Sequence, residues 1–438
     1  MAGMRVLMVS WEYPPRIIGG IARHVDELSR ALARAGVEVE VLTAHHPGAP
    51  EREEVPVRGP AGGGLRVLRA GASPLNALDF VCEIHQLEFG LLARALAEGE
   101  RRYDLIHAHD WVVAFAARTL KHGLGIPLVA TMHATEAGRN QGIHTPMQRY
   151  IHSVEWLLTY EAWRVICCSR GMAAELARGM AVPGEKVRVA PNGVDPARVK
   201  CSDPAEVVAE FRKRWAAPEE RIVLFVGRLV REKGAEVLIE AMPEVVAAHP
   251  EAKLVVAGGG WYGGLRERAA ALGVGHKVVF GGFVPEEDLP RLYAVAEVAV
   301  YPSLYEPFGI VALEAMAAGV PVVTSDIGGF REVVRHGKTG IHTWANNPRS
   351  LAWGIKEVLS DGRLAGRLRR AGKREVRERY GWDGIAKQTI GIYEEVVRER
   401  ERAARPRELP ASGPGVRARY LGGGAGGSRP AAGTGSRS

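Results

Sequence analysis

Short apolar runs alternate along this chain with longer segments of helical periodicity, and the alternation is interrupted once before it starts again. Runs such as Arg5–Ser10 and Leu128–Met132 are typical of buried strands, and residues 21–35 repeat apolar side chains at helical spacing. The interruption is PNGVDP at residues 191–196, where two prolines and Asn-Gly predict a turn. Ile222–Val226 then opens a second series. The pattern predicts an α/β protein with two doubly wound, Rossmann-like domains.

The turn sets the expected domain limits. We predict one domain over residues 1–195, a second over 196–384 and a further helix over 385–402. Residues 48–64 are rich in Gly, Pro and Glu and predict a surface loop. Residues 403–438 consist largely of Gly, Pro, Ala, Ser and Arg without periodicity, which predicts a disordered basic tail.

Charge and cysteine content exclude several classes of protein. The net charge of +8 comes largely from arginines of the tail, so charge gives little support for a nucleic-acid partner, and none is predicted. The four cysteines have no C-x-x-C spacing, which fits a reducing compartment. No signal peptide and no apolar run of roughly 18–20 residues is visible. We therefore expect a cytoplasmic protein.

The segment Ser303–Gly319, SLYEPFGIVALEAMAAG, predicts a strand end, a tight loop and a helix. Gly309 opens the helix, and Gly319 stands where a left-handed residue closes one. Glu314 falls inside an otherwise apolar helix, where a carboxylate needs donors, and Glu306 lies in the preceding loop. Free N–H groups at the helix start suit a phosphate, and the two carboxylates can accept sugar hydroxyls. The alternative is an amphipathic helix with one exposed glutamate.

Polar residues follow other predicted strands as well. Gly19 and Gly20 form the first strand-to-helix turn, where backbone N–H groups can approach a phosphate, although no G-x-G-x-x-G fingerprint is present. His109 and Asp110 end one strand and His133 ends the next. These ends meet at one edge of a parallel sheet, so a shared functional site is predicted; the alternative is structural histidines.

Arg228 and Lys233 lie in one strand-to-helix loop of the second domain. Two cations there suit a diphosphate, because arginine can bridge two oxygens. No acidic neighbour other than Glu232 is evident in the loop. A solvated surface loop is the alternative.

Taken together, these segments resemble the retaining nucleotide-sugar glycosyltransferases of the GT-B fold, known as group 1 or family 4 and including glycogen synthases. The resemblance extends to about residue 400. It is carried by SWEYPPRIIGGIARHV, HAHDW, TMHATE, PNGVD, VGRLVREKG and YEPFGIVALEAMAAGVPVV. It implies two Rossmann-like domains that face each other across a cleft, with the helix 385–402 bracing the hinge.

The resemblance also implies roles for the donor-binding residues. The diphosphate of the donor would be held by Gly19, Gly20, Arg228, Lys233 and the backbone of Phe308, Gly309 and Ile310. Glu314 would accept the ribose hydroxyls, and the segment around Phe283 would face the nucleobase. The catalytic set would be His133, Glu306, Lys233 and Arg228, with His133 at the 6-hydroxyl and Glu306 beside the transferred sugar. His109 and Asp110 would shape the acceptor side.

The implied reaction transfers a hexose, with glucose favoured, from ADP-glucose or UDP-glucose to a saccharide or an α-glucan. The family uses no metal for the diphosphate, and the chain has no Asp-x-Asp, so neither metal nor cofactor is expected. The departing phosphate would deprotonate the acceptor on the same face, which retains configuration. Ile17 stands where bacterial glycogen synthases carry the lysine of Lys-x-Gly-Gly, and Glu314 is a residue those enzymes lack, so the ADP-glucose class is not a clean match.

Several alternatives stay open. Within the fold, a sugar-nucleotide epimerase or a phosphorylase would perform different chemistry. A transferase acting on a lipid-linked acceptor would contact a membrane surface. A non-enzymatic carbohydrate-binding protein would use the basic tail, and it would lose its function when that tail is deleted.

Overall fold

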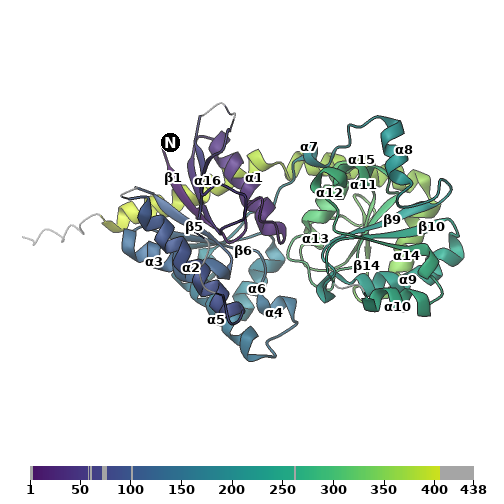
Figure 1. Cartoon of the computed structure of the whole chain (residues 1–438), viewed down its shortest axis with the longest axis horizontal. Coiled ribbons are helices and arrows are strands. Elements are labelled where there is room, and N and C mark those ends of the chain that lie inside the picture. Colours follow the sequence, from purple (N-terminus) through teal and green to yellow (C-terminus); the bar gives the residue numbers. More distant parts are fainter. Residues whose placement is uncertain are drawn as a thin grey trace, which may run out of the picture.

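The strand–helix alternation forms two separate parallel sheets, one in each half of the chain (Figure 1). The computed structural model describes residues 3–57, 59, 62–71, 76–99, 102–260 and 263–404. Nearly all of the predicted tail at 403–438 therefore lies outside the described residues. Two wound sheets with helices on their faces are the GT-B arrangement expected from the sequence.

The first sheet has eight strands within the described residues, in the order β3-β4-β2-β1-β5-β6-β7-β8. All neighbours run parallel except β3, which is antiparallel to β4. The strands are β1 (Arg5–Val9), β2 (Glu38–Thr43), β3 (Arg52–Glu54), β4 (Leu65–Arg69), β5 (Leu105–His109), β6 (Leu128–Met132), β7 (Arg164–Cys167) and β8 (Val187–Val189). The helices are α1 (Gly20–Arg34), α2 (Phe80–Ala97), α3 (Ala114–Leu124), α4 (Glu136–Arg139), α5 (Pro146–Glu161) and α6 (Arg170–Met180).

The second sheet is wholly parallel and has six strands in the described residues, in the order β11-β10-β9-β12-β13-β14. The strands are β9 (Arg221–Val226), β10 (Ala252–Ala257), β11 (Val278–Gly282), β12 (Val298–Tyr301), β13 (Val322–Ser325) and β14 (Ile341–Thr343). The helices are α7 (Pro196–Val199), α8 (Ala205–Arg212), α9 (Ala235–Ala248), α10 (Gly263–Ala271), α11 (Leu289–Ala294), α12 (Ile310–Ala318), α13 (Phe330–Val333), α14 (Pro348–Ser360), α15 (Gly362–Arg379) and α16 (Trp382–Ala404).

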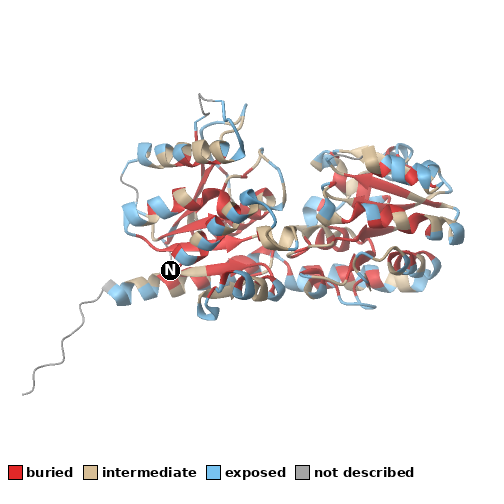
Figure 2. Cartoon of the chain, turned by 90° about the horizontal axis from the view of Figure 1, so that it is seen from below, coloured by how far each residue is buried: buried red, intermediate tan, exposed pale blue. Residues whose placement is uncertain are grey.

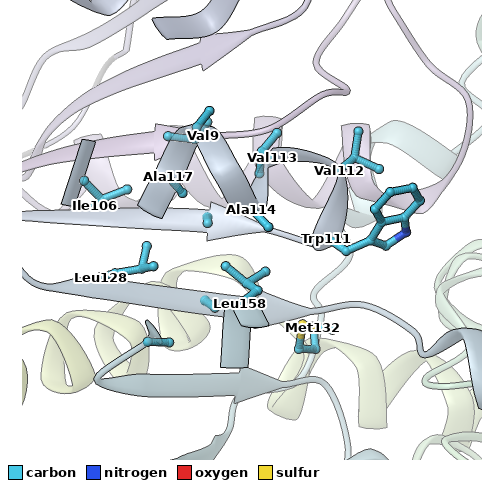
Figure 3. Close-up of a cluster of buried hydrophobic side chains, with 14 of the residues drawn as sticks. Val9, Ile106, Trp111, Val112, Val113, Ala114, Ala117, Leu128, Met132 and Leu158 are labelled. Carbon is cyan, nitrogen blue, oxygen red and sulfur yellow. The ribbon is translucent and has the colours of Figure 1, made fainter. Parts of the chain in front are cut away.

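Both sheets are buried on their two faces, which explains why their strands are apolar runs rather than alternating ones. Figure 2 shows the buried strands inside each domain and the exposed outer surfaces of the helices. In the first domain, Val9, Ile106 and Leu128 come from neighbouring strands, and Leu158 of α5 packs over them (Figure 3). Within the described residues, every helix is too short or too polar to cross a bilayer.

One prediction for the first sheet is wrong. Residues 48–64 were expected to form only a loop, yet β3 pairs there with β4, from Arg52 opposite Leu68 to Glu54 opposite Arg66. A three-residue strand of charged side chains has no local signal, because its pairing depends on a distant partner. Arg66 compensates the charge by pairing with Glu54.

The strand orders identify the edges where ligands bind. In the first sheet β1 lies between β2 and β5, and in the second β9 lies between β10 and β12, so the order reverses at β1 and at β9. In open α/β sheets, ligands bind beyond the carboxyl ends of strands at such reversals. Every candidate site residue but two follows β1, β5, β9 or β12. The exceptions are His133, which follows β6, and Phe283, which follows β11.

The last helix returns from the second domain to the first. α16 begins three residues before the predicted start, packs against α1, and pairs Asp383 with Arg34 at 2.8 Å. The Trp382 ring lies 5.5 Å from the His24 ring, centroid to centroid. A Cβ on Gly193 would lie 2.7 Å from Trp382, so this glycine lets the interdomain turn pass closely over the helix start.

Candidate active site

The loop after β9 brings a lysine and a glutamate together. Lys233 ends a 3₁₀ turn, and its Nζ lies 2.7 Å from Glu306 Oε2, which also accepts a hydrogen bond from Ser303 Oγ at 3.3 Å. Glu306 is buried, and a buried carboxylate needs such donors. Arg228 has Glu232 at 3.6 Å and is half exposed. The expectation of two cations with no acidic neighbour beyond Glu232 is therefore wrong for Lys233.

α12 begins directly after Gly309, whose backbone conformation sets the start of the helix. Gly309 has a φ of +103°, and a Cβ there would lie 2.4 Å from the Phe330 ring, so only glycine fits. Gly319 closes the helix in the left-handed region, as predicted. The Phe308 side chain is buried against Tyr380, so only its backbone can face a ligand.

Glu314 lies buried within α12, so the exposed-glutamate alternative is wrong. Its Oε2 accepts a hydrogen bond from the Tyr293 hydroxyl at 3.2 Å. Its other oxygen is paired with Arg23 of α1, in the first domain. Glu314, which was expected to accept the ribose hydroxyls, is therefore engaged in an ion pair between the domains. Neither Arg23 nor Tyr293 was predicted as its partner.

The Gly19–Gly20 turn holds a carboxylate of its own chain. Glu12 Oε2 accepts hydrogen bonds from the N–H groups of Ile18 at 2.9 Å and Gly19 at 2.8 Å. Burial raises the pKa of Glu12. A Cβ on Gly20 would lie 3.4 Å from Ile310 Cδ1, so this turn directly faces the start of α12 across the domain boundary.

Buried imidazoles line the carboxyl edge of the first sheet. His109 Nδ1 lies 3.2 Å from His133 Nε2, and His24 Nδ1 lies 2.8 Å from the Asn192 side-chain oxygen. Burial lowers the pKa of His24 to about 4 and the pKa values of His109 and His133 well below their usual value. These rings are therefore neutral near pH 7, and each can donate one hydrogen bond and accept another.

Two acids near these rings are also shifted towards the neutral form. Asp110 has a φ of +65°, and burial raises its pKa to about 6 although Arg139 lies 3.9 Å away. Burial also raises the pKa of Glu155 to about 9. Both acids therefore hold their protons to a higher pH than free carboxyl groups do.

The two domains also meet at the loop before α12. The Tyr305 hydroxyl accepts a hydrogen bond from the Thr135 N–H at 3.1 Å and donates one to Glu175 at 3.0 Å. Ser169 Oγ donates to the Pro307 carbonyl at 2.7 Å. The loop that carries Glu306 therefore rests on the first domain just after His133.

The candidate residues fall into three contacting groups. These groups are Lys233 with Glu306, His109 with His133, and the Gly20 turn with the start of α12. Among the predicted donor residues, Phe283 is 78% exposed and contributes no such contact. Arg23 and Glu12 were missed, although both lie in the SWEYPPRIIGGIARHV segment. The partner of Arg23 is 291 positions away, whereas Glu12 binds the nearby N–H groups of Ile18 and Gly19, a contact that depends on the fold of the turn. The role of each candidate residue stays a prediction.

Comparisons with known proteins agree with this architecture. Residues 207–375 match the family described as Glycosyl transferases group 1, and residues 18–198 match Glycosyltransferase Family 4. An uncharacterized glycosyltransferase of Methanocaldococcus jannaschii is 41% identical over 89% of this chain and 98% of its own. A glycogen synthase of Mycobacterium tuberculosis is 36% identical over 92% of this chain and 97% of its own. The solved sucrose-phosphate synthase of Thermosynechococcus elongatus is 28% identical, with a TM-score of 0.77 over 91% of this chain and 100% of that one.

Proposed function

The chain belongs to the glycosyl transferases of group 1, and from this premise we propose that it is a retaining, metal-independent hexosyltransferase. Its donor is a nucleoside diphosphate sugar, with ADP-glucose and UDP-glucose as the first candidates. Its acceptor is a saccharide, for which an α-glucan is the leading candidate. The likeness to a glycogen synthase over almost the whole chain supports the glucan, and the four free cysteines support a reducing, cytoplasmic site of action.

The observation that carries the proposal is the Lys233–Glu306 pair beside the start of α12. When the bond from the anomeric carbon to the diphosphate breaks, positive charge develops on the sugar and negative charge on the diphosphate. Lys233 and the N–H groups at the helix start stabilise the diphosphate, and Glu306 stabilises the sugar. Fixed charges aimed at developing charge provide much of the rate enhancement in such sites.

The first domain supplies the other half of the reaction. Neutral His133 can hydrogen-bond a sugar hydroxyl without competing for the diphosphate. The leaving phosphate oxygen takes the proton of the acceptor hydroxyl on the same face, so the configuration at the anomeric carbon is retained. Closure of the two domains excludes water and limits hydrolysis of the donor.

The test is a thermal-shift titration with ADP, UDP, GDP and their glucose adducts, each with and without EDTA. A ligand that binds only the folded state raises the melting temperature by mass action. We expect one nucleotide series to stabilise the protein equally in both conditions. No shift with any nucleotide would contradict the proposal, and a shift abolished by EDTA would contradict metal independence. Retention is tested separately, from the anomeric proton coupling of the first product.

A lipid-linked acceptor is the second candidate, because α2 and α5 expose apolar side chains. Phe89 is 69% exposed and Leu96 75%, and Trp156 stacks on exposed Tyr160. Against it, Arg94 of α2 is already paired with Glu51 and Glu98. Sedimentation with anionic vesicles decides: binding would favour this acceptor class, and its absence would favour the soluble saccharide.

A further inference from the structure

Three imidazoles from separate elements converge beside the candidate active site. His24 comes from α1, His109 ends β5, and His133 follows β6. One ring nitrogen from each lies within 4.8 Å of the other two, and the ring centroids are 4.8 to 5.5 Å apart. His24 is more than 80 positions from the other two residues in the chain, and the fold places the three nitrogen ligands around one point.

The nitrogens of this cluster lack partners that would explain their burial. His24 Nε2 is buried and makes no hydrogen bond within the described residues; His109 Nε2 is unpartnered as well, but it is not the His109 nitrogen that meets His133. An unpartnered buried polar atom costs free energy, so a group that binds there is favoured. An imidazole that carries one ring proton has a lone pair on its other nitrogen, which can bind a ligand.

The orientation of His24 is that of a metal ligand. Its Nδ1 lies 2.8 Å from the Asn192 side-chain oxygen, which can only accept, so the ring proton sits on Nδ1 and the lone pair on Nε2. Metal-binding histidines characteristically donate their second ring N–H to such an oxygen. His109 Nδ1 and His133 Nε2 lie 3.2 Å apart, close to the roughly 3.3 Å between two nitrogens bound to tetrahedral zinc at about 2.0 Å.

The charges around the cluster also favour a cation. Asp110 follows His109 directly and has a buried oxygen, Oδ1, with no hydrogen-bond partner within the described residues. Glu12 also acts on Asp110 electrostatically. Arg139 opposes binding, but it is held near the Asp110 carboxylate at 3.9 Å. The Asp110 carboxylate would lie next to a dication bound here as a counter-charge.

We propose that His24, His109 and His133 form a binding site for a borderline transition-metal ion such as Zn²⁺, and that the bound ion inhibits transfer. Three histidines leave a fourth position for solvent, as in other three-ligand zinc sites. The ion takes no part in catalysis. Inhibition rests on the proposed function, because it follows from tying up His133 where the donor sugar is expected.

The test uses untagged, metal-stripped full-length protein titrated with Co²⁺, whose visible absorption becomes intense in four-coordinate nitrogen sites. We expect one intense site per chain, displaced by one equivalent of Zn²⁺. His24→Gln should weaken Co²⁺ binding at least 10-fold, on the scale seen for altered metal-site residues. His276→Gln, which changes an exposed histidine, should leave binding unchanged.

A weak six-coordinate spectrum, or equal binding by wild type and His24→Gln, would overturn the site and leave an ordered water as the partner of these nitrogens. If His24→Gln does not fold, Asn192→Ala replaces it, with an expected 10- to 100-fold loss of affinity through the disoriented ring. Binding without inhibition of transfer would overturn the inhibitory role. Nucleotide thermal shifts, measured without metal, report on the proposed function independently of all these outcomes.

Discussion

The two domains share one strand–helix plan, yet the side chains at the carboxyl edges of their sheets differ in which protonation state is favoured. In the first domain, His109 and Asp110 are buried and His133 is partly buried, and the pKa values of all three are shifted towards the neutral form. In the second domain, Lys233 and Glu306 are held as an ion pair 2.7 Å apart. Burial favours the neutral form of a group and a nearby opposite charge favours the charged form; for Asp110 the effect of burial exceeds that of Arg139 at 3.9 Å.

This difference matches the two halves of a nucleotide-sugar donor. A diphosphate is an anion and needs fixed cations, while a sugar or glucan presents neutral hydroxyls that need groups able to donate and accept hydrogen bonds. Two contacts link the edges: Arg23 of the first domain pairs with Glu314, and Tyr305 of the second domain accepts a hydrogen bond from the Thr135 N–H. The comparison predicts that removing a charged side chain from the second domain lowers kcat strongly. In the first domain, it predicts that the titration of a buried acid changes stability with pH.

The largest effect is expected for Lys233→Ala. The substitution removes the cation that faces the leaving diphosphate and leaves Glu306 buried beside only Ser303. We expect kcat to fall 10²- to 10³-fold, the range seen when one preorganised charge contact is lost. Steady-state kinetics at saturating donor measures it, and near-normal turnover would contradict the assignment.

Two further variants sharpen that result. Lys253→Ala removes a lysine of β10 that is paired with Glu220, and it should leave kcat unchanged. Arg228→Ala should cost less than Lys233→Ala, because the Arg228 side chain is half exposed and solvent screens its charge. An equal loss for Arg228 and Lys233 would mean that domain closure buries both cations around the donor.

An intermediate effect is expected for Glu314→Gln. If this carboxylate accepts the ribose hydroxyls, the donor KM should rise about 10-fold, equivalent to roughly 1.4 kcal/mol, with little change in kcat. Arg23→Gln removes the residue that competes for Glu314 and should not raise the donor KM. A pure kcat defect in Glu314→Gln, or an equal KM rise in both variants, would assign the pair a structural role instead.

A pH-dependent effect on stability rather than on catalysis is expected for Glu88 of α2, a buried acid of the first domain. Its carboxylate accepts the N–H of Phe115 at 2.8 Å, and burial raises its pKa to about 7. The folded state therefore binds a proton more tightly than the unfolded state, so this contribution to stability is full below about pH 4.5 and is lost as the pH rises through about 7.

Glu88→Gln removes this titration. The difference in unfolding free energy between variant and wild type should change between pH 5 and pH 8 by an amount on the order of 1–3 kcal/mol, in favour of the variant at high pH. Denaturant melts at both pH values measure it. Glu83→Gln, an exposed change on the same helix, should show no such pH dependence. A pH-independent difference for Glu88 would mean that the carboxylate is already ionised in the folded protein.

The sequence predicted the local features of this site and missed those that cross the fold. Gly309, Gly319 and the strands before them were predictable because a left-handed glycine and a buried apolar run leave local patterns. The Arg23–Glu314 pair joins residues 291 positions apart, and the sequence around either residue carries no local pattern that indicates its partner. His24 likewise sits in a helix as one polar residue among others, and only the fold turns it towards His133.

Deletion of residues 405–438 is expected to have the smallest effect on catalysis. It also distinguishes an enzyme from a binding protein. α16 begins at Trp382, by the domain junction, and its 23 residues extend about 35 Å along the first domain, away from the second domain (Figure 1). The end of α16, where the deleted segment is attached, therefore lies several Debye lengths from the start of the helix, at roughly 8 Å each in physiological salt. Donor KM and kcat should therefore change less than about twofold, well below the tenfold that 1.4 kcal/mol represents. The binding-protein alternative would be favoured if neither the full-length chain nor the deletion variant turned over donor and the deletion abolished saccharide binding. The affinity for the saccharide would then lie in the arginines of the tail rather than in the paired charges between the domains.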